Sequence, residues 1–233
     1  PLVILGVFKY FNFFGATLTA LCRAVSIPFS APVLSIILPV GISFYTFQTL
    51  SYTIDVYRGR MKAERDFVLF ALFVSYFPQL VAGPIERAAD LLPQLREACS
   101  FRYEQGAHGA RLMAWGFFKK CVCAAYLGAL ADKVYGDVGA FGGGAAAFAT
   151  AAFALQIYCD FGGYSDIACG CSELLGVELT VNFKRPYFAR TMRDFWRRWH
   201  ISLTGWFREY VYIPLGGNRR GRGRTALLTL VTF

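Results

Sequence analysis

The sequence predicts an all-α protein that crosses a membrane several times. Of its 233 residues, 56% are hydrophobic, more than the roughly 45–50% of an average soluble domain. Three runs contain no Asp, Glu, Lys or Arg: 31 residues between Arg23 and Asp55, 22 residues from Val138 to Cys159, and 19 residues from Phe67 to Ile85. Each run is near the ~20 residues that a helix needs to cross a bilayer. Composition therefore indicates an integral membrane protein with several helical spans.

The candidate spans follow these runs and the breaks between them. In chain order they are residues 1–22, 33–54, 67–83, 110–131, 145–159 and a short sixth segment, 164–179. Pro39 and Gly41 predict a kink in the second span. The stretch Asp90–Glu97 sets three leucines against three charged residues, which predicts a helix lying along the membrane interface. Burying the charges of Lys119 and Lys120 in the middle of a span costs free energy, which favours a fourth span that begins near Lys119.

The net charge of +9 is confined to the last part of the chain. Residues 1–183 carry 13 basic and 13 acidic side chains, whereas residues 184–233 carry 11 basic side chains against Asp194 and Glu209. A basic block beside membrane spans normally lies on the cytoplasmic side, and the basic loop 55–66 falls on the same side as this block. We expect this face to attract anionic lipid head groups. Nucleic-acid binding is disfavoured, because no motif for it appears.

The sequence contains no pattern for a disulfide framework, a metal site or a Ser or Cys nucleophile. Seven cysteines form no C-x-x-C pair and mostly lie in apolar stretches, so we interpret them as small buried hydrophobic residues. The two histidines, His108 and His200, have no acidic residues at ligand spacing. No Gly-x-Ser-x-Gly elbow is present. We therefore expect no metal and no bound cofactor.

Both ends of the sequence are typical of the interior of a longer chain. Residue 1 is not methionine, no signal peptide is present, and the apolar run Thr225–Phe233 is too short to span a membrane. We expect a single membrane-embedded domain over residues 1–233, incomplete at both ends.

The most unusual stretch, Phe195–Tyr210, holds three of the four tryptophans together with His200. Thr191 and Asp194 form a capping-box-like start, which predicts a helix through this stretch. One face of that helix would carry Trp196, Trp199, His200, Leu203 and Phe207. Asp194 can reach both Arg197 and Arg198, at i+3 and i+4. The imidazole is interpreted either as a packed histidine or as a functional group.

A second polar cluster, Tyr158–Asp166, lies in the link predicted between the fifth and sixth segments. Its Gly-Gly pair indicates a tight turn. Two interpretations of Asp160 and Asp166 stay open. Either they belong to a polar loop that caps two helices, or one of them is buried against an arginine between 190 and 208.

Two further stretches connect these clusters to the end of the chain. Asn182–Tyr187 leads to the His200 helix and is interpreted as a cytoplasmic loop. Pro214 ends that helix, and the Gly-Gly-Asn turn after it leads into a cluster of arginines. The cluster is either a positive-inside anchor or a site for the phosphates of a nucleotide-like or phosphopantetheine donor.

Several of these stretches occur together in one known family. They are Leu38–Gln48, Phe77–Ile85, Tyr158–Asp166, Phe195–His200 and Tyr212–Arg219. Read in this order, they resemble the membrane-bound O-acyltransferase family, from about Lys9 to the C-terminus. The run Tyr-Ile-Pro-Leu-Gly-Gly-Asn-Arg points to the branch that O-acetylates alginate rather than the branch that D-alanylates teichoic acid. Gly162 departs from the pattern, which commonly has serine at this position.

The resemblance implies helices around a central funnel in the bacterial inner (plasma) membrane. Proteins of this family pass an acyl group from a cytoplasmic thioester donor, acetyl-CoA or an acyl carrier, toward an acceptor hydroxyl or a partner across the membrane. For this chain it implies acetyl transfer toward hydroxyls of an exported polysaccharide such as alginate, with a periplasmic or extracellular acetyltransferase as partner. The alternative is transfer of D-alanyl or another acyl group to a cell-wall polymer.

The resemblance also assigns residues. His200 matches the first of two characteristic histidines and takes a supporting role. The second, regarded as the catalytic base, falls in a later span beyond Phe233, so this piece alone is expected to be inactive. The residues expected to line the site or bind substrate are Trp196, Arg198, Trp199, Arg208, Asp160, Asp166 and Asn182. Acyl transfer to a hydroxyl needs a base with a near-neutral pKa and an apolar site that keeps water from the thioester.

Two other classes of function stay open. An ion path through Lys9, Asp160 and His200 would make the protein a transporter or channel; inverted repeats would favour this, and the sequence shows none. A structural subunit would instead use the basic block at 184–224 to recruit a partner.

Overall fold

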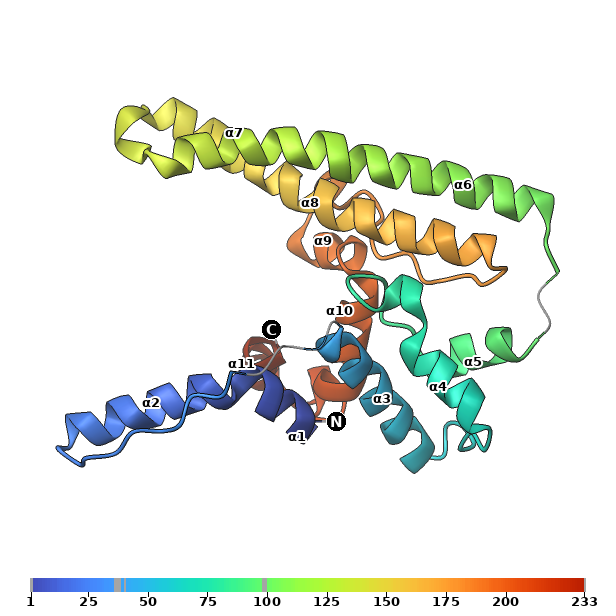
Figure 1. Cartoon of the computed structure of the whole chain (residues 1–233), viewed down its shortest axis with the longest axis horizontal. Helices are drawn as coiled ribbons and strands as arrows, with labels where there is room; N and C mark the ends of the chain where they lie inside the picture. Colours follow the sequence, from blue (N-terminus) through green and yellow to red (C-terminus); the bar gives the residue numbers. More distant parts are fainter. Residues whose placement is uncertain (1, 36–38, 40, 98–99, 233) are drawn as a thin grey trace.

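The computed structural model describes residues 2–35, 39, 41–97 and 100–232, and every secondary-structure element in this part of the chain is helical (Figure 1). The α-helices are α1 (Leu2–Leu5), α2 (Phe11–Ala24), α3 (Ile42–Tyr57), α4 (Phe67–Ser75), α5 (Ala88–Arg96), α6 (Tyr103–Phe117), α7 (Ala125–Gly136), α8 (Gly143–Leu174), α9 (Met192–Arg198), α10 (Ile201–Phe207) and α11 (Arg222–Thr232). Short π- or 3₁₀-helical turns, η1 to η7, are Gly6–Tyr10, Phe77–Gln79, Phe118–Ala124, Val138–Ala140, Pro186–Phe188, Arg208–Tyr212 and Gly217–Arg220.

The upper arm in Figure 1 is an antiparallel helical hairpin, which we call the hairpin arm. In it, α6, η3 and α7 follow one another without a break and pack along α8. A Cβ added to Gly116 would lie 2.6 Å from the carbonyl oxygen of Gly163, and one added to Gly163 would lie 2.7 Å from that of Gly116. The two backbones are therefore almost in contact, and only glycine fits at this crossing.

The predicted division of residues 145–179 into two segments is wrong. Helix α8 runs from Gly143 to Leu174 without interruption, so the Gly-Gly pair at 162–163 lies inside the helix. Gly163 is required for close packing on α6 and η3 rather than for a turn. Tertiary packing has outweighed the local turn signal of the glycines. The predicted fourth span, 110–131, is likewise part of a longer helical run that begins at Tyr103.

Two helical stretches have the length and composition of a membrane span, namely Leu2–Ala24 and Gly143–Leu174. The apolar helical stretch Phe67–Gln79 is shorter. The predicted second span, 33–54, falls partly on residues 36–38 and 40, which lie outside the described residues; its helix, α3, begins at Ile42. A larger number of spans stays a prediction.

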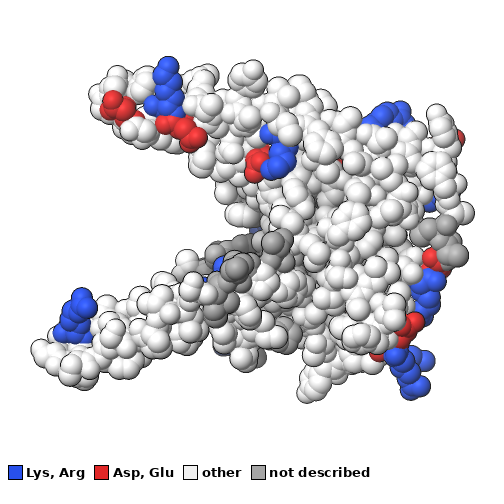
Figure 2. Space-filling view, in the orientation of Figure 1, with Lys and Arg blue, Asp and Glu red and all other residues white. Residues whose placement is uncertain are grey.

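The outer surface agrees with a membrane setting. Figure 2 shows charged side chains at the tips of the two arms and along the opposite edge, with a largely uncharged surface between them. Large apolar side chains are exposed along both arms, including Phe13 and Phe148, each 64% exposed. A soluble monomer rarely exposes apolar surface of this extent, whereas helices in a bilayer present it to the lipid.

Two apolar clusters hold the remaining helices together. In the first, Phe73 of α4 packs against Leu91 of α5, and both side chains are fully buried. Thus the predicted amphipathic stretch is a helix with leucines inward; its place at the interface stays a prediction. In the second cluster, Trp206 packs against α3 and donates a hydrogen bond from Nε1 to the carbonyl oxygen of Phe47 at 3.1 Å. This contact anchors α10 and thereby positions the residues just before it.

Candidate functional site

The predicted continuous helix through residues 195–210 is wrong, because the chain breaks at His200. Helix α9 ends at Arg198, and His200 adopts the left-handed conformation, with φ 44° and ψ 55°, before α10 begins at Ile201. A left-handed non-glycine residue costs roughly 1–3 kcal/mol and persists only where its surroundings impose it. The aromatic residues and the histidine therefore do not form a single helical stripe.

The break is imposed by backbone pairing with an earlier segment. Lys184 N donates to the carbonyl oxygen of Arg198 at 2.9 Å, and Ile201 N donates to the carbonyl oxygen of Asn182 at 3.0 Å. These two bonds flank His200 on both sides and tie residues 198–201 to residues 182–184. We refer to Asn182–Ser202 as the His200 segment.

Asn182 is fully buried and fixes the start of α10. Its Oδ1 accepts hydrogen bonds from Ser202 N at 3.2 Å and from Ser202 Oγ at 2.7 Å. Ser202 Oγ in turn accepts from Ile85 N at 3.0 Å. Asn182 Nδ2 has no hydrogen-bond partner among the described residues. A buried donor without a partner costs about 1–3 kcal/mol, which makes this amide a candidate ligand contact.

The imidazole of His200 lies between two phenylalanine rings. The ring of Phe161, from α8, meets it edge-on at a centroid distance of 4.7 Å, and Phe183 is roughly parallel to it at 6.4 Å. Its Nε2 atom is buried and has no partner in the described part of the chain. Burial lowers the pKa of His200 to about 4, because the apolar surroundings disfavour the imidazolium. The imidazole is therefore neutral at pH 7.

An aromatic wall continues from this histidine toward α8. Trp199 lies 5.0 Å from Phe183 and stacks on Phe195 at 5.5 Å, centroid to centroid. Tyr158 of α8 closes the wall at 5.9 Å from Phe183. Trp196 lies at the edge of the wall and is 40% exposed. Rings at these separations and tilts attract one another and exclude water.

The prediction that Asp160 or Asp166 pairs with an arginine between 190 and 208 is wrong. Lys119 Nζ lies 2.5 Å from Asp166 Oδ2, and Lys120 Nζ lies 2.5 Å from Asp160 Oδ1. The reason is the register of the hairpin arm, which sets η3 opposite the middle of α8. Lys119 is 8% exposed and lies 5.6 Å from the centre of the Tyr158 ring, on the aromatic wall.

The arginines of the predicted site lie outside this wall. Arg198 forms a bidentate pair with Asp194, with both contacts at 2.9 Å, as the spacing predicts. The hydrogen bond from Arg198 holds the pKa of Asp194 below its usual value. Thr191 Oγ1 accepts from Asp194 N at 3.1 Å, which confirms the predicted cap. Arg208, in η6, is exposed and forms no ion pair with any described residue.

The structure thus brings together only some of the predicted site residues. Asn182, Trp199 and His200 meet in the His200 segment, and Asp166 joins them through Lys119 and Tyr158. The other predicted residues lie at the surface: Asp160 is half-exposed, and Trp196 and Arg208 are exposed.

Sequence reasoning missed three buried charges, namely Asp55, Glu86 and Lys119. Lys119 was placed at a span boundary, although a lysine pair in an apolar helix already signals partners on a facing helix. Glu86, 3% exposed, accepts hydrogen bonds from Thr180 N at 2.5 Å and from Thr180 Oγ1 at 3.1 Å. Burial raises the pKa of Glu86 above its usual value. This contact ties residues 83–87 to the segment that leads to Asn182.

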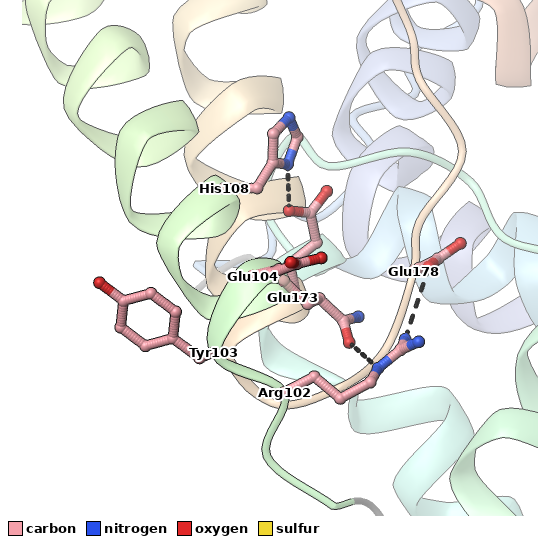
Figure 3. A pocket seen from close by; sticks show the side chains of 7 residues that line it. Arg102, Tyr103, Glu104, His108, Glu173 and Glu178 are labelled. Atoms are coloured by element: carbon pink, nitrogen blue, oxygen red, sulfur yellow. Dashed lines mark hydrogen bonds and ion pairs between the residues drawn. The ribbon is translucent and has the colours of Figure 1, made fainter.

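The second histidine belongs to a separate pocket at the open end of the hairpin arm. This pocket of about 570 Å³ is shown in Figure 3. His108 Nδ1 lies 2.6 Å from Glu173 Oε2. Arg102 Nη2 lies 3.9 Å from Glu178 Oε1, and Arg102 Nε donates to Gln105 Oε1 at 3.0 Å. Several polar groups of this pocket thus pair with one another, whereas Gln105 Nε2 is buried without a partner among the described residues. None of the predicted site residues lines it.

Two helices long and apolar enough to cross a membrane, and a surface between the arm tips and the opposite edge that is largely uncharged, agree with a helical membrane protein. Comparison with known sequences identifies its family. Residues 64–233 match the sequence model of the membrane-bound O-acyltransferase family, and because the match covers most of the chain, the protein belongs to this family.

Similar curated proteins include members with different acceptors. A probable alginate O-acetylase from Pseudomonas putida is 42% identical over 96% of this chain and 46% of its own length. A peptidoglycan O-acetyltransferase from Helicobacter pylori is 34% identical over 93% of this chain and 45% of its own length. A teichoic acid D-alanyltransferase from Streptococcus thermophilus is 29% identical over 76% of this chain and 44% of its own length. The chain thus spans less than half the length of these relatives.

Proposed function

We propose that this chain is part of an enzyme that moves an acetyl group from a thioester donor toward hydroxyls of an exported polysaccharide such as alginate. Identity of 42% to a probable alginate O-acetylase supports the polysaccharide. We further propose one membrane-embedded domain over residues 1–233, which continues in the parent protein, with several spans around a funnel in the bacterial inner membrane.

The observation that carries this proposal is the pair of unpartnered atoms in the His200 segment, His200 Nε2 and Asn182 Nδ2. In the reaction, the acceptor hydroxyl oxygen attacks the thioester carbonyl carbon, the carbon–sulfur bond breaks, and the hydroxyl proton leaves through a base to the thiolate. A neutral imidazole can hold the hydroxyl or the donor through Nε2. The Asn182 amide can donate to the carbonyl oxygen as negative charge develops on it.

The aromatic wall supplies the second requirement of the reaction. A thioester is open to hydrolysis, so the site must exclude water while the acceptor approaches. Trp199, Phe183 and Tyr158 form an apolar surface beside His200. Because His200 has a supporting role in this scheme, we assign the main base to a second histidine in the continuation of the chain beyond Phe233, and we expect residues 1–233 alone to be inactive.

We assign the donor to the cytoplasmic, basic side. Arg208 is exposed and free of ion pairs with described residues, so it can bind phosphates of acetyl-CoA or of an acyl carrier. Trp196, at the edge of the aromatic wall, would contact the same donor. A periplasmic or extracellular acetyltransferase would receive the acyl group or complete the transfer to the polysaccharide.

A cell-wall polymer is the second candidate acceptor, because a peptidoglycan O-acetyltransferase is 34% identical to this chain. D-alanyl transfer is less supported, since the D-alanyltransferase is 29% identical and covers less of the chain. Offering alginate and peptidoglycan as competing acceptors to the same vesicles would separate the two candidates.

The test of the proposal is His200→Ala in the full-length protein, with His108→Ala as matched control. Vesicles carrying each variant receive a labelled acyl thioester, and label on the polysaccharide is measured. We expect His200→Ala to lose at least about 100-fold, the scale of one general acid–base or hydrogen-bonding group, while His108→Ala stays near the wild-type rate. Equal insertion of both variants is checked by immunoblot. Normal transfer by His200→Ala would remove the proposed role, and no transfer by the wild type would favour a transporter or docking subunit.

A further inference from the structure

A basic pocket opens between α5 and the loop that precedes α4. Its volume is about 900 Å³, and the charged residues that line it are Lys62, Glu64, Arg65 and Arg96. Its apolar lining includes Met61 and Leu92. No residue of the His200 segment lines this pocket, so it is a separate feature of the molecule.

Both carboxylate oxygens of Glu64, in this pocket, have partners nearby. Glu64 accepts hydrogen bonds from Arg65 N at 2.9 Å and from Asp66 N at 3.0 Å, and its other oxygen pairs with Arg96. These contacts, led by the hydrogen bond from the Asp66 backbone, hold the pKa of Glu64 below its usual value. Glu64 therefore stays ionised at neutral pH and shapes the loop around the pocket.

Two cations at the rim are left without a counter-ion. Among the described residues, no carboxylate oxygen lies within 4.0 Å of Lys62 Nζ or of the Arg65 guanidinium. Both side chains are exposed. Two uncompensated positive charges above an apolar floor favour a ligand that is anionic at one end and apolar at the other.

The surroundings of the pocket indicate where such a ligand comes from. Asp66 caps α4 through hydrogen bonds from Val68 N and Leu69 N, and the first residues of that helix are strongly exposed. Phe67 is 80% exposed and Val68 74%, while Tyr57, just before the loop, is 91% exposed. Exposed aromatic and aliphatic side chains beside a basic loop are typical of the level at which hydrocarbon gives way to head groups.

We propose that this pocket binds the head group of an anionic phospholipid, with the phosphate between Lys62 and Arg65 and the glycerol end against Met61 and Leu92. The phosphates of a soluble thioester donor share this chemistry, but they would gain nothing from the exposed apolar residues beside the rim. The inference rests on the membrane setting alone, and its test involves no turnover, so it stands or fails independently of acyl transfer.

The test uses the full-length protein in detergent, titrated with fluorescent phosphatidylglycerol or with the matching phosphatidylcholine. Each basic side chain near an anionic lipid contributes about 1 kcal/mol, so Lys62→Gln/Arg65→Gln should weaken binding of phosphatidylglycerol about 30-fold. The control, Arg58→Gln/Arg111→Gln, removes the same charge from exposed residues outside the pocket and should change binding less than about threefold.

Thermal unfolding of both double variants checks that they fold. A preference for phosphatidylglycerol that only the Lys62/Arg65 variant loses would support the proposal. Equal binding of the two lipids, or equal loss in both variants, would overturn it, because either result means non-specific attraction. Displacement of the lipid by millimolar inorganic phosphate or coenzyme A would also overturn it, in favour of a soluble phosphate ligand.

Discussion

Two sets of buried polar groups, one in the middle of the hairpin arm and one in the His200 segment, differ in whether they have partners. In the hairpin arm, Lys119 is paired with Asp166 at 2.5 Å, and the backbones meet through glycines. In the His200 segment, His200 Nε2 and Asn182 Nδ2 are buried without partners. A saturated pair stabilises a fixed arrangement, whereas unsatisfied groups cost stability and are typical of ligand sites. The comparison is consistent with a structural role for the first region and with the binding role that we propose for the second.

Among the substitutions that test this comparison, Lys119→Met is expected to have the largest effect on the free energy of unfolding. It leaves the Asp166 carboxylate inside the hairpin arm without its partner, and removal of one member of a buried pair costs about 3–5 kcal/mol. We expect the lower end, about 3 kcal/mol, since the Asp166 side chain is 24% exposed and partly screened. The measurement is the thermal unfolding temperature of the full-length protein in detergent.

The double variant Lys119→Met/Asp166→Leu is the control for this prediction. It removes both charges and should recover most of the stability, because an apolar pair can replace a buried ion pair at little cost. If the double variant recovers its unfolding temperature but loses acyl transfer, the pair is more than a structural element. That result would contradict the division between the two regions.

How far the sequence predicts this structure depends on whether a signal is local. The Thr191 cap and the Asp194–Arg198 pair involve residues three and four apart, and both are present as predicted. The long apolar run after residue 1 is helical through Ala24. These features need only helical periodicity and cap chemistry, which residues carry without reference to the rest of the chain.

The errors occur where distant segments decide the outcome. A Gly-Gly pair in a sequence can indicate either a turn or a close contact with a neighbouring backbone. At 162–163, Gly163 makes a close contact with the backbone of the facing helix. The break at His200 depends on hydrogen bonds to residues 182–184. The partner of Asp166 depends on the register of two antiparallel helices. None of these can be read from the spacing of neighbouring residues.

A smaller effect concerns pH and contrasts the two histidines. His200 lies outside the two candidate spans, and its pKa of about 4 is below the ~6.5 of an unfolded histidine. As pH falls from 6.5 to 4, the unfolded state takes up a proton that the folded His200 does not. The free energy of unfolding therefore drops in this window, by on the order of 2 kcal/mol, and the contribution is fully present above pH 6.5.

The measurement is the unfolding temperature of wild type and of His200→Phe between pH 4 and 7. The phenylalanine keeps the aromatic contacts but cannot titrate, so the variant should show a flatter pH profile than the wild type. His108→Phe, at a side chain that is 63% exposed, serves as the control for loss of a histidine at the surface. Identical profiles for wild type and His200→Phe would show that His200 is not buried as a neutral ring.

The smallest stability effects are expected at Arg198 and Arg208, which lie outside the buried regions compared above. Arg198→Gln breaks a half-exposed pair with Asp194 and should lower the unfolding temperature only slightly. Arg208→Gln removes an exposed side chain with no ion pair among described residues and should leave the unfolding temperature unchanged.

The same substitution tests the kinetic role of Arg208. If Arg208 binds donor phosphates, its loss should raise the KM for the thioester about tenfold with little change in kcat, since the contact is the same in ground and transition states. A fall in kcat at constant KM would instead place Arg208 at the reacting atoms, where we also place His200.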